Sequence, residues 1–229
     1  MKTVEDFQNG QVLLIDKPLN WTSFQVVNKL RWKIRKTFNL KKIKVGHAGT
    51  LDPLADGLLI ICTGKMTKKI DQFQKLNKIY TGKFFLGATT PSYDLETEIN
   101  SKKSIDHITE KLILKTTEDF KGKTIQTPPI YSAIKHKGKK LYEFARKGET
   151  VKIKEREIFI SEFLITKKQL PELDFLVNCS KGTYIRSLAN DFGKKLECGA
   201  YLSKLTRTAI GDHLLENAIS IEDFDKTLN

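Results

Sequence analysis

Apolar residues recur at steps of three and four along two stretches of the chain, as they do on the buried face of a helix. The first stretch follows Thr22 and Ser23, either of which can cap the start of a helix. The second stretch follows a polar turn and covers residues 184–196. The residues expected to face inward are Phe24, Val27, Leu30, Ile34 and Phe38 in the first helix and Ile185, Leu188, Phe192 and Leu196 in the second.

Short apolar runs and alternating runs predict the strands. Strands are expected over residues 11–18, 58–62, 80–86, 174–179 and 200–210, with one or two more over residues 151–165 and a polar loop over residues 88–98. Shorter helices are expected over residues 68–75, from Ser104 or Asp106 to about residue 122, over residues 141–146 and after Ser220. This order predicts an α/β (α+β) fold with a mixed, largely antiparallel sheet flanked by helices. No repeat or linker marks a second domain, so residues 1–229 are expected to form one domain.

The chain has a formal net charge of +13, from 40 basic and 27 acidic residues. A surplus of this size predicts a polyanionic partner, with nucleic acid as the first candidate. Lysine outnumbers arginine by 34 to 6, so a drift of composition towards lysine remains a second explanation. The polar face of the first helix, with Lys29, Lys33 and Lys36, is either an RNA contact or a solvated face.

Four lysines gather at Lys135, Lys137, Lys139 and Lys140, just after the irregular segment 127–132. Together with the short helix that follows, they predict a protruding element. Such an element either grips phosphates as a mobile basic finger or is an ordinary solvated hairpin. Both interpretations remain open from these residues alone.

Three cysteines, Cys62, Cys179 and Cys198, form no CxxC pair, which argues against a disulfide framework and for a reducing compartment. The four histidines have no zinc-ligand spacing, and a phosphate loop is excluded because Met66 stands where Ser or Thr is required. We therefore expect neither a metal nor an organic cofactor. The chain has no signal-peptide pattern and no apolar run of membrane-spanning length, so we expect a cytoplasmic protein without membrane association.

Residues 46–57 hold three glycines and a proline, so the backbone must turn sharply and leave room for a close approach. The buried strand expected next makes this loop a rigid support for one side chain. Asp52 is the candidate, because Pro53 pushes it towards extended geometry and thereby fixes its direction. The alternative is that Asp52 only hydrogen-bonds the backbone of a turn, as Asp before Pro often does.

Several segments together resemble the motifs of one enzyme family. The sequence GHAGTLDPLA at residues 46–55 closely resembles the catalytic motif of the bacterial tRNA pseudouridine-55 synthases, the TruB family. Residues 12–22, centred on Asp16-Lys17-Pro18, resemble the first motif of that family, and residues 179–188 resemble the third. Residues 128–135 and 141–146 are similar to its insertion, expected at about residues 125–150. The resemblance covers about residues 10–210.

The resemblance implies a pseudouridine-synthase fold with an inserted basic finger, and the isomerisation of uridine 55 in the T loop of tRNA. It also implies a role for each matching residue. Asp52 is the catalytic aspartate, Tyr80 the active-site tyrosine against the flipped base, Tyr184 a second aromatic wall, and Arg186 a salt-bridge partner of the aspartate, while Lys17, His47 and Leu205 support the pocket or contact the RNA.

These residue types fit the reaction. Breaking the bond between uracil N1 and ribose C1′ needs an anionic oxygen near C1′, and Asp52 can either attack C1′ or promote loss of the 2′ proton to give a glycal. A carboxylate in a closed pocket loses solvation, which an adjacent guanidinium such as that of Arg186 offsets. Because the uracil re-bonds through C5, the pocket must hold the base and exclude water, a task for Tyr80, Tyr184 and Leu205. His47 can fill the stack that a flipped base leaves.

Each of these residues also has an ordinary interpretation. Tyr80 and Tyr184 can be core aromatics, His47 a turn residue and Arg186 part of a surface ion pair. Two competing functions stay open: a non-catalytic RNA-binding or tRNA-folding protein on the same scaffold, and a transglycosylase that releases free uracil.

Longer members of the family carry a C-terminal RNA-binding domain of the PUA type, for which the residues up to Asn229 leave no room. We therefore expect a short form in which a basic surface compensates, through Lys33, Lys36 and the lysines at 135–140. The expected partner is the T arm of tRNA, and the expected state is a monomer.

Overall fold

The computed structural model describes residues 2–228, in which the chain divides into two compact units. The first unit holds residues 1–80 and 205–229, and the second holds residues 81–204. Strands β4 (Lys78–Leu86) and β12 (Ala200–Ile210) contribute residues to both units. The expectation of one domain over residues 1–229 stays a prediction.

The sheet of the first unit is built around β3 (Ala55–Thr63), the buried apolar strand that follows the glycine-rich loop. On one edge, β1 (Val12–Lys17) pairs antiparallel with it. On the other edge, β2 (Val45–His47) pairs antiparallel near the end of β3, and β12 pairs parallel near its start, with Leu205 opposite Ala55. The short strand β13 (His213–Leu214) turns back and pairs antiparallel with the end of β12.

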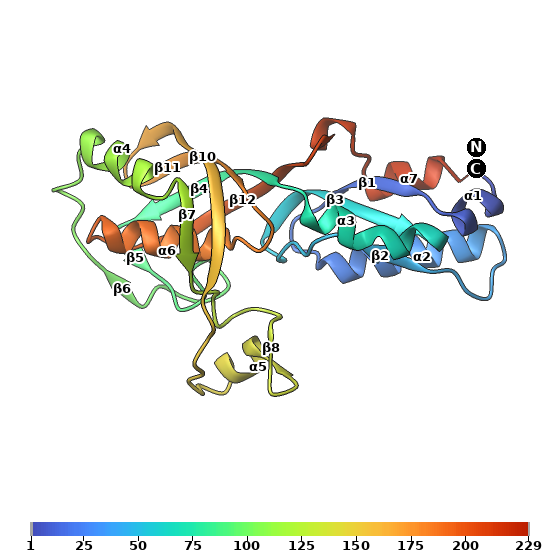
Figure 1. The fold of residues 1–229 in the computed structure, drawn as a ribbon, viewed down its shortest axis with the longest axis horizontal. Helices are drawn as coiled ribbons and strands as arrows, with labels where there is room; N and C mark the ends of the chain where they lie inside the picture. The colour runs from blue at the N-terminus through green and yellow to red at the C-terminus, as the bar shows by residue number, and fades with distance from the viewer. Residues whose placement is uncertain (1, 229) are drawn as a thin grey trace. The chain divides into compact units, whose positions relative to one another are not determined.

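Helices cover both faces of this sheet. One core cluster joins it to α1 (Val4–Asn9), α2 (Ser23–Thr37) and α7 (Ile221–Lys226). A second cluster joins the opposite face to the 3-10 helix η1 (Gly64–Lys69) and to α3 (Ile70–Lys75). A further 3-10 helix, η2 (Leu215–Asn217), precedes α7 in the C-terminal part of the chain, which is red in Figure 1.

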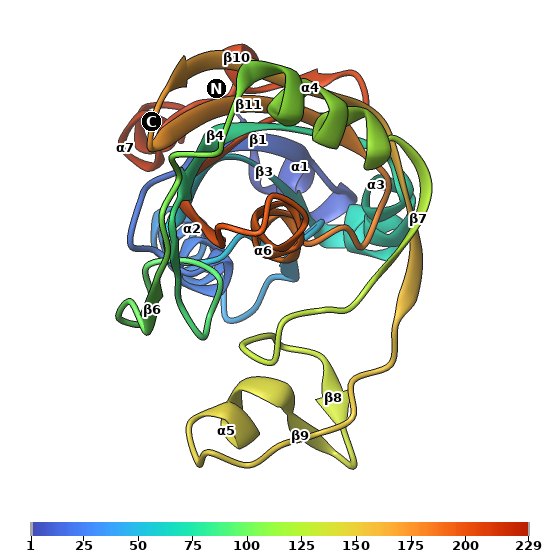
Figure 2. The same cartoon turned by 90° about the vertical axis from the view of Figure 1, so that its left-hand side faces the viewer.

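The second unit places β4, β11 (Glu172–Cys179), β10 (Arg156–Gln169) and β7 (Gly122–Gln126) in that order in the sheet. Figure 2 shows α6 (Ile185–Lys195) running inside the curve of these strands. Its Phe192 packs on Phe84 and Phe163, with ring centroids 5.7 and 5.5 Å apart. Helix α4 (Glu110–Asp119) also contacts β10 and α6. Because residues 185–190 are all buried, the N-terminal part of α6 is enclosed by the core on every side.

Short elements complete the second unit. Strands β5 (Ala88–Thr89) and β6 (Ser101–Lys102) form a small hairpin. Strands β8 (Lys135–His136) and β9 (Lys139–Lys140) form another, followed by α5 (Leu141–Ala145), all three drawn in yellow in Figure 1. The turn of the second hairpin is Lys137-Gly138, and both residues have positive φ, as a two-residue hairpin turn requires.

The mixed, largely antiparallel sheet flanked by helices is confirmed, but some local expectations are wrong. Phe24 is 61% exposed, because the buried face of α2 runs through Val26, Val27, Leu30 and Ile34. The helix expected to start at Ser104 or Asp106 is α4, which begins at Glu110 and is capped by Thr109, whose side chain accepts a bond from the backbone of Leu112.

Lys33 is also placed differently from the expectation of a basic surface residue. Its side chain is buried and forms an ion pair with Asp225 and a hydrogen bond to the carbonyl of Ile221, both from the α7 region. Lys33 therefore fastens α2 to α7 and is not part of an RNA contact. Within residues 2–228, every helix falls short of the length and apolar character needed to cross a bilayer.

Candidate active site

The loop that carries Asp52 is anchored by the first residue of α2. Ser23 donates its hydroxyl proton to the carbonyl oxygen of Leu51 at 3.1 Å and accepts a bond from the amide of Leu51 at 2.8 Å. The capping box of Thr22 and Gln25 fixes the start of the helix around Ser23. Both backbone groups of the residue just before Asp52 are therefore tied to a helix end.

The buried guanidinium of Arg207 also holds this loop, through hydrogen bonds to its backbone. Arg207 on β12 is 1% exposed, and it donates to the carbonyl oxygens of Leu58 at 2.8 Å, Gly49 at 3.1 Å and Thr50 at 3.5 Å. The close approach of β12 also explains Gly57, whose φ is +97° and whose missing Cβ would lie 2.5 Å from the carbonyl oxygen of Arg207. The loop is thus bound to both neighbouring strands, β3 and β12.

Lys17 supplies a buried positive charge beside this loop. Its side chain is fully buried, and its ammonium donates to the carbonyl oxygens of Pro18 at 2.9 Å and Trp21 at 2.6 Å. Burial lowers the pKa of Lys17 to about 8, although the nearby carboxylates of Asp56 and Asp52 act to raise it. Lys17 is therefore an electrostatic neighbour of Asp52, held by the backbone that leads into α2.

His47 ends β2 directly before the loop. Burial lowers its pKa, and the positive charge of Arg207 lowers it further, so the imidazole is neutral at pH 7. Tyr80 on β4 and Leu205 on β12 are both buried in this unit. The register that sets Leu205 opposite Ala55 holds it beside the end of the loop.

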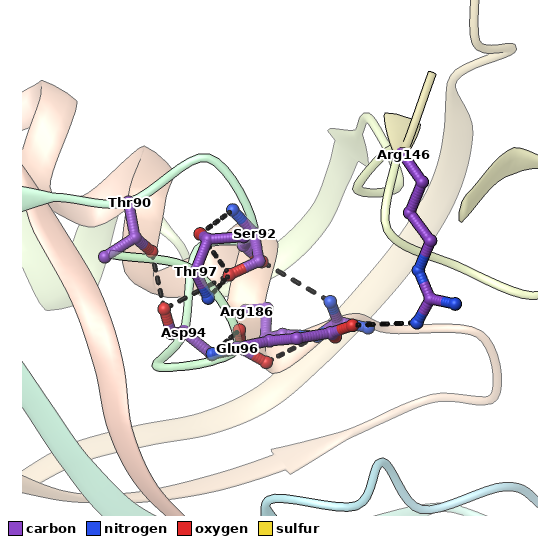
Figure 3. A network of polar contacts seen from close by, with 7 residues as sticks. All are labelled: Thr90, Ser92, Asp94, Glu96, Thr97, Arg146 and Arg186. Carbon is purple, nitrogen blue, oxygen red and sulfur yellow. Dashed lines mark hydrogen bonds and ion pairs between the residues drawn. The ribbon is translucent and has the colours of Figure 1, made fainter. Parts of the chain in front are cut away.

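In the second unit, Arg186 stands in the first turn of α6 and forms a buried ion pair with Asp94. The Nε atom of Arg186 lies 3.6 Å from Oδ2 of Asp94, and the two side chains are 4% and 6% exposed. Arg186 also donates to the carbonyl oxygen of Ser92 at 3.4 Å. Figure 3 shows the guanidinium lying against the loop that carries Ser92 and Asp94.

The loop around Asp94 is itself ordered by polar contacts. The hydroxyls of Thr90 and Ser92 donate to the carbonyl oxygen of Asp94 at 2.6 and 3.2 Å, and the amide of Glu96 donates to its carboxylate at 3.0 Å. At its outer end, Glu96 forms an ion pair with Arg146 at 3.8 Å, as Figure 3 shows. The Asp94 carboxylate is therefore fixed in direction before any substrate is present.

Tyr184 precedes α6 and is held through its backbone. Its amide donates to the side-chain oxygen of Gln126 at 2.8 Å, and the Gln126 side-chain nitrogen donates to the Tyr184 carbonyl at 3.0 Å. The guanidinium of Arg156 lies 5.3 Å from the centre of the Tyr184 ring. Tyr184 and Arg186 therefore share one well-supported helix start.

The hairpin of β8 and β9 presents the expected lysines. Lys135, Lys137 and Lys139 are exposed, while Lys140 and Arg146 lie over the ring of Tyr142 at 5.5 and 5.2 Å. A concave surface next to the hairpin is lined by four basic residues, Lys135, Lys152, Lys154 and Arg156, together with Ile134, His136, Leu141, Ile153 and Glu155. The hairpin is confirmed, and its binding of phosphate stays a prediction.

Of the expected site residues, the first unit holds Lys17, His47, Asp52, Tyr80 and Leu205, and the second holds Tyr184 and Arg186. Their roles stay predictions. Two further residues were not singled out from the sequence. Arg207 is one of only six arginines and lies in an expected strand, and a charged residue in a strand could have indicated a buried structural role. Asp94 lies in a polar loop, and nothing in the sequence distinguishes it there.

Comparisons with curated proteins agree along nearly the whole chain. A protein of Flavobacterium johnsoniae named tRNA pseudouridine synthase B is 58% identical over 227 residues, which cover 99% of each chain. A protein of the same name from Phocaeicola vulgatus is 51% identical over 224 residues, covering 98% of this chain and 95% of that one.

Two solved structures share the fold. A Cbf5-Nop10-Gar1 complex contains a chain with a TM-score of 0.71 and 28% identity, and an H/ACA RNP bound to a substrate RNA containing 2′-deoxyuridine contains one with 0.68 and 26%. Each match covers 96% of this chain and 54% or 53% of the solved chain, so this chain spans about half the length of those chains. The sequence profile described as "TruB family pseudouridylate synthase (N terminal domain)" matches residues 35–185. This chain belongs to the TruB family of pseudouridylate synthases.

Proposed function

We infer that this chain is an isomerase that converts a uridine of tRNA into pseudouridine. Its membership of the TruB family and its identity of about half or more to several proteins named tRNA pseudouridine synthase B support this inference. The observation that carries it in this structure is the loop of Asp52, which Ser23 and Arg207 bind through the carbonyl and amide groups of its backbone. A reaction that needs one carboxylate at a fixed position requires such a support.

We further propose that the uridine is that of position 55 in the T loop and that Asp52 acts on it. The bond between N1 and C1′ breaks, the base turns within the pocket, and a bond forms between C5 and C1′. The proton lost from C5 balances the proton gained at N1, so the product is an isomer of the substrate. Attack of Asp52 on C1′ and removal of the 2′ proton both place its carboxylate beside the ribose.

The remaining residues receive roles that fit their surroundings. Tyr80 and Tyr184 are proposed as aromatic walls for the flipped base, with Leu205 closing the pocket. His47 is proposed to occupy the stack that the base leaves, and its neutral imidazole suits that task. Arg186 is proposed to orient Asp52, while Asp94 holds the Arg186 guanidinium in place.

The proposed complex is that of a monomer with the T arm of one tRNA. The exposed lysines of the β8–β9 hairpin and the basic surface beside it support contact with phosphates. We place the protein in the cytoplasm, since an odd number of cysteines without a CxxC pair is typical of a reducing compartment. Light scattering of the pure protein, alone and with tRNA, tests the monomer.

The experiment that tests the activity is chemical mapping of pseudouridine on unmodified tRNA after incubation with the pure protein. Pseudouridine at a single T-loop position, without release of free uracil, is the expected result. Binding of tRNA without any pseudouridine would instead favour a non-catalytic RNA-binding protein. Free uracil in the reaction would favour a transglycosylase.

A further inference from the structure

The stretch between Lys17 and Asp52 contains no acidic residue. Residues 18–51 include eight lysines and arginines and neither Asp nor Glu. Most of this stretch forms α2 and the segment that connects it to β2. A local charge of one sign over so many residues makes this part of the surface attractive to a polyanion.

Not every basic side chain of α2 is available to a partner. Lys33 is engaged with Asp225, Arg31 donates to the carbonyl oxygen of Val45 at 2.9 Å, and Arg35 donates to that of Leu40 at 3.2 Å. Lys29 and Lys36 differ from these three, because among the described residues neither ammonium donates to a carbonyl oxygen or pairs with a carboxylate, and each lies instead near the ring of Trp32.

Between these two lysines lies a large exposed aromatic side chain. Trp32 is 53% exposed, and the ammonium groups of Lys29 and Lys36 lie 5.4 and 5.0 Å from the centre of its ring. Exposed tryptophan is uncommon outside binding surfaces, since much of its energetic value comes from burial. Lysine and tryptophan on one helix face combine the two groups that hold nucleic acid strands, a cation for the phosphate and an aromatic face for the base.

We propose that Lys29, Trp32 and Lys36 form a docking face on α2 for a strand of the tRNA substrate, with one base stacked on Trp32 and the flanking phosphates on the lysines. The flexible lysine side chains turn from the ring towards the phosphates when the base arrives. This proposal rests on the proposed function for the identity of the RNA. The absence of acidic residues from the whole stretch favours RNA over a protein partner.

The position of this face connects it with the reaction. Ser23, the first residue of α2, holds Leu51 beside Asp52, and Trp32 follows nine residues later. At about 1.5 Å per residue, Trp32 lies about 14 Å further along the helix axis. Nine residues are two and a half turns, so Trp32 projects from the side of α2 opposite Ser23, and a strand docked there lies a few nucleotides from the catalytic loop, within the same unit of the protein.

The first test measures tRNA affinity. We expect Trp32→Ala to weaken binding about 10-fold, the cost of losing one stacked base, and Trp32→Phe to restore most of it. Lys29→Gln with Lys36→Gln should reduce the slope of log affinity against log salt by about 1.4 to 1.8. The matched control is Lys111→Gln with Lys115→Gln on α4, which removes the same charge from a helix face that also carries Glu110 and Glu118.

The second test observes the ring directly. The chain has two tryptophans, so Trp21→Phe leaves Trp32 as the single tryptophan fluorophore, and Trp32→Phe leaves Trp21. We expect tRNA to quench the emission of Trp32 strongly and that of Trp21 little. Unchanged affinity of Trp32→Ala together with unquenched Trp32 emission would overturn the proposal and leave a protein as the occupant of this face.

The two proposals fail in different ways. If the wild-type protein forms pseudouridine and Trp32→Ala binds tRNA as tightly as the wild type, only the docking face is wrong. If the wild-type protein forms no pseudouridine but Trp32→Ala still weakens tRNA binding, the docking face stands and the isomerase activity is wrong.

Discussion

Arg207 donates from Nη2 to the carbonyl oxygen of Gly49 at 3.1 Å, across a separation of 158 residues in the chain. Through this contact and its bond to Leu58, one buried guanidinium connects β12 both to the loop that carries Asp52 and to strand β3, which follows that loop. Carbonyl oxygens are good partners for a buried cation, and the planar fork of arginine reaches several of them at once.

Arg207→Met should lower the free energy of unfolding by about 3 kcal/mol, because several buried carbonyl groups lose their donor. Arg207→Lys keeps the charge but not the fork, so it should fold and yet turn over about 100-fold more slowly with little change in tRNA affinity. Urea unfolding and single-turnover kinetics measure the two effects. Normal turnover of a folded Arg207→Lys would show that the loop does not depend on this support.

Asp94→Asn should destabilise the protein by about 3 kcal/mol, since it leaves the buried Arg186 guanidinium without the carboxylate at 3.6 Å. Glu96→Gln is the matched control, because the ion pair of Glu96 with Arg146 lies at the surface and should contribute no more than about 0.5 kcal/mol. Thermal and urea unfolding of both variants give the comparison. Equal stabilities would mean that burial does not distinguish the two pairs.

Lys17 predicts a dependence of stability on pH. The unfolded chain keeps the Lys17 proton up to its ordinary pKa of 10.5, whereas the folded protein releases it near pH 8. Between these values the unfolded state binds more protons, so rising pH favours folding, by at most about 1.4 kcal/mol per pH unit from this residue. The unfolding free energy of the wild type minus that of Lys17→Met should therefore increase from about pH 8 to pH 10. A constant difference would contradict the lowered pKa.

The affinity for tRNA should fall steeply with salt, by at least about 100-fold between low and physiological ionic strength, if several phosphates are held by lysines. Lys137→Gln with Lys139→Gln, at the tip of the β8–β9 hairpin, should make the dependence shallower. The double variant on α4, Lys111→Gln with Lys115→Gln, should leave it unchanged. Affinity that is flat with salt would exclude the basic surfaces as the main source of binding.

The sheet, the two long helices and the Asp52 loop were predictable from the sequence, because apolar periodicity and glycine placement encode them locally. Phe24 shows the limit of that reasoning: it has helical spacing, but the sheet below α2 meets Val26, Val27 and Leu30 instead. Lys33 shows the same limit for charge, since only the fold brings Asp225 beside it.

The candidate site follows the same division. Asp52 was expected because its loop is encoded by neighbouring residues, and the family resemblance supplied the others. Arg207 contacts Gly49, and Asp94 contacts Arg186, each across a long separation in the sequence. No local sequence pattern predicts such pairs. Their roles follow from burial and contacts, which only the folded chain provides.

The most direct test of the central claim is the rate of pseudouridine formation by Asp52→Asn on saturating unmodified tRNA. The account predicts a loss of at least about 1000-fold with tRNA binding retained, while Asp71→Asn, which removes an exposed carboxylate from α3, keeps the wild-type rate. Pseudouridine formation by Asp52→Asn at the wild-type rate would contradict it.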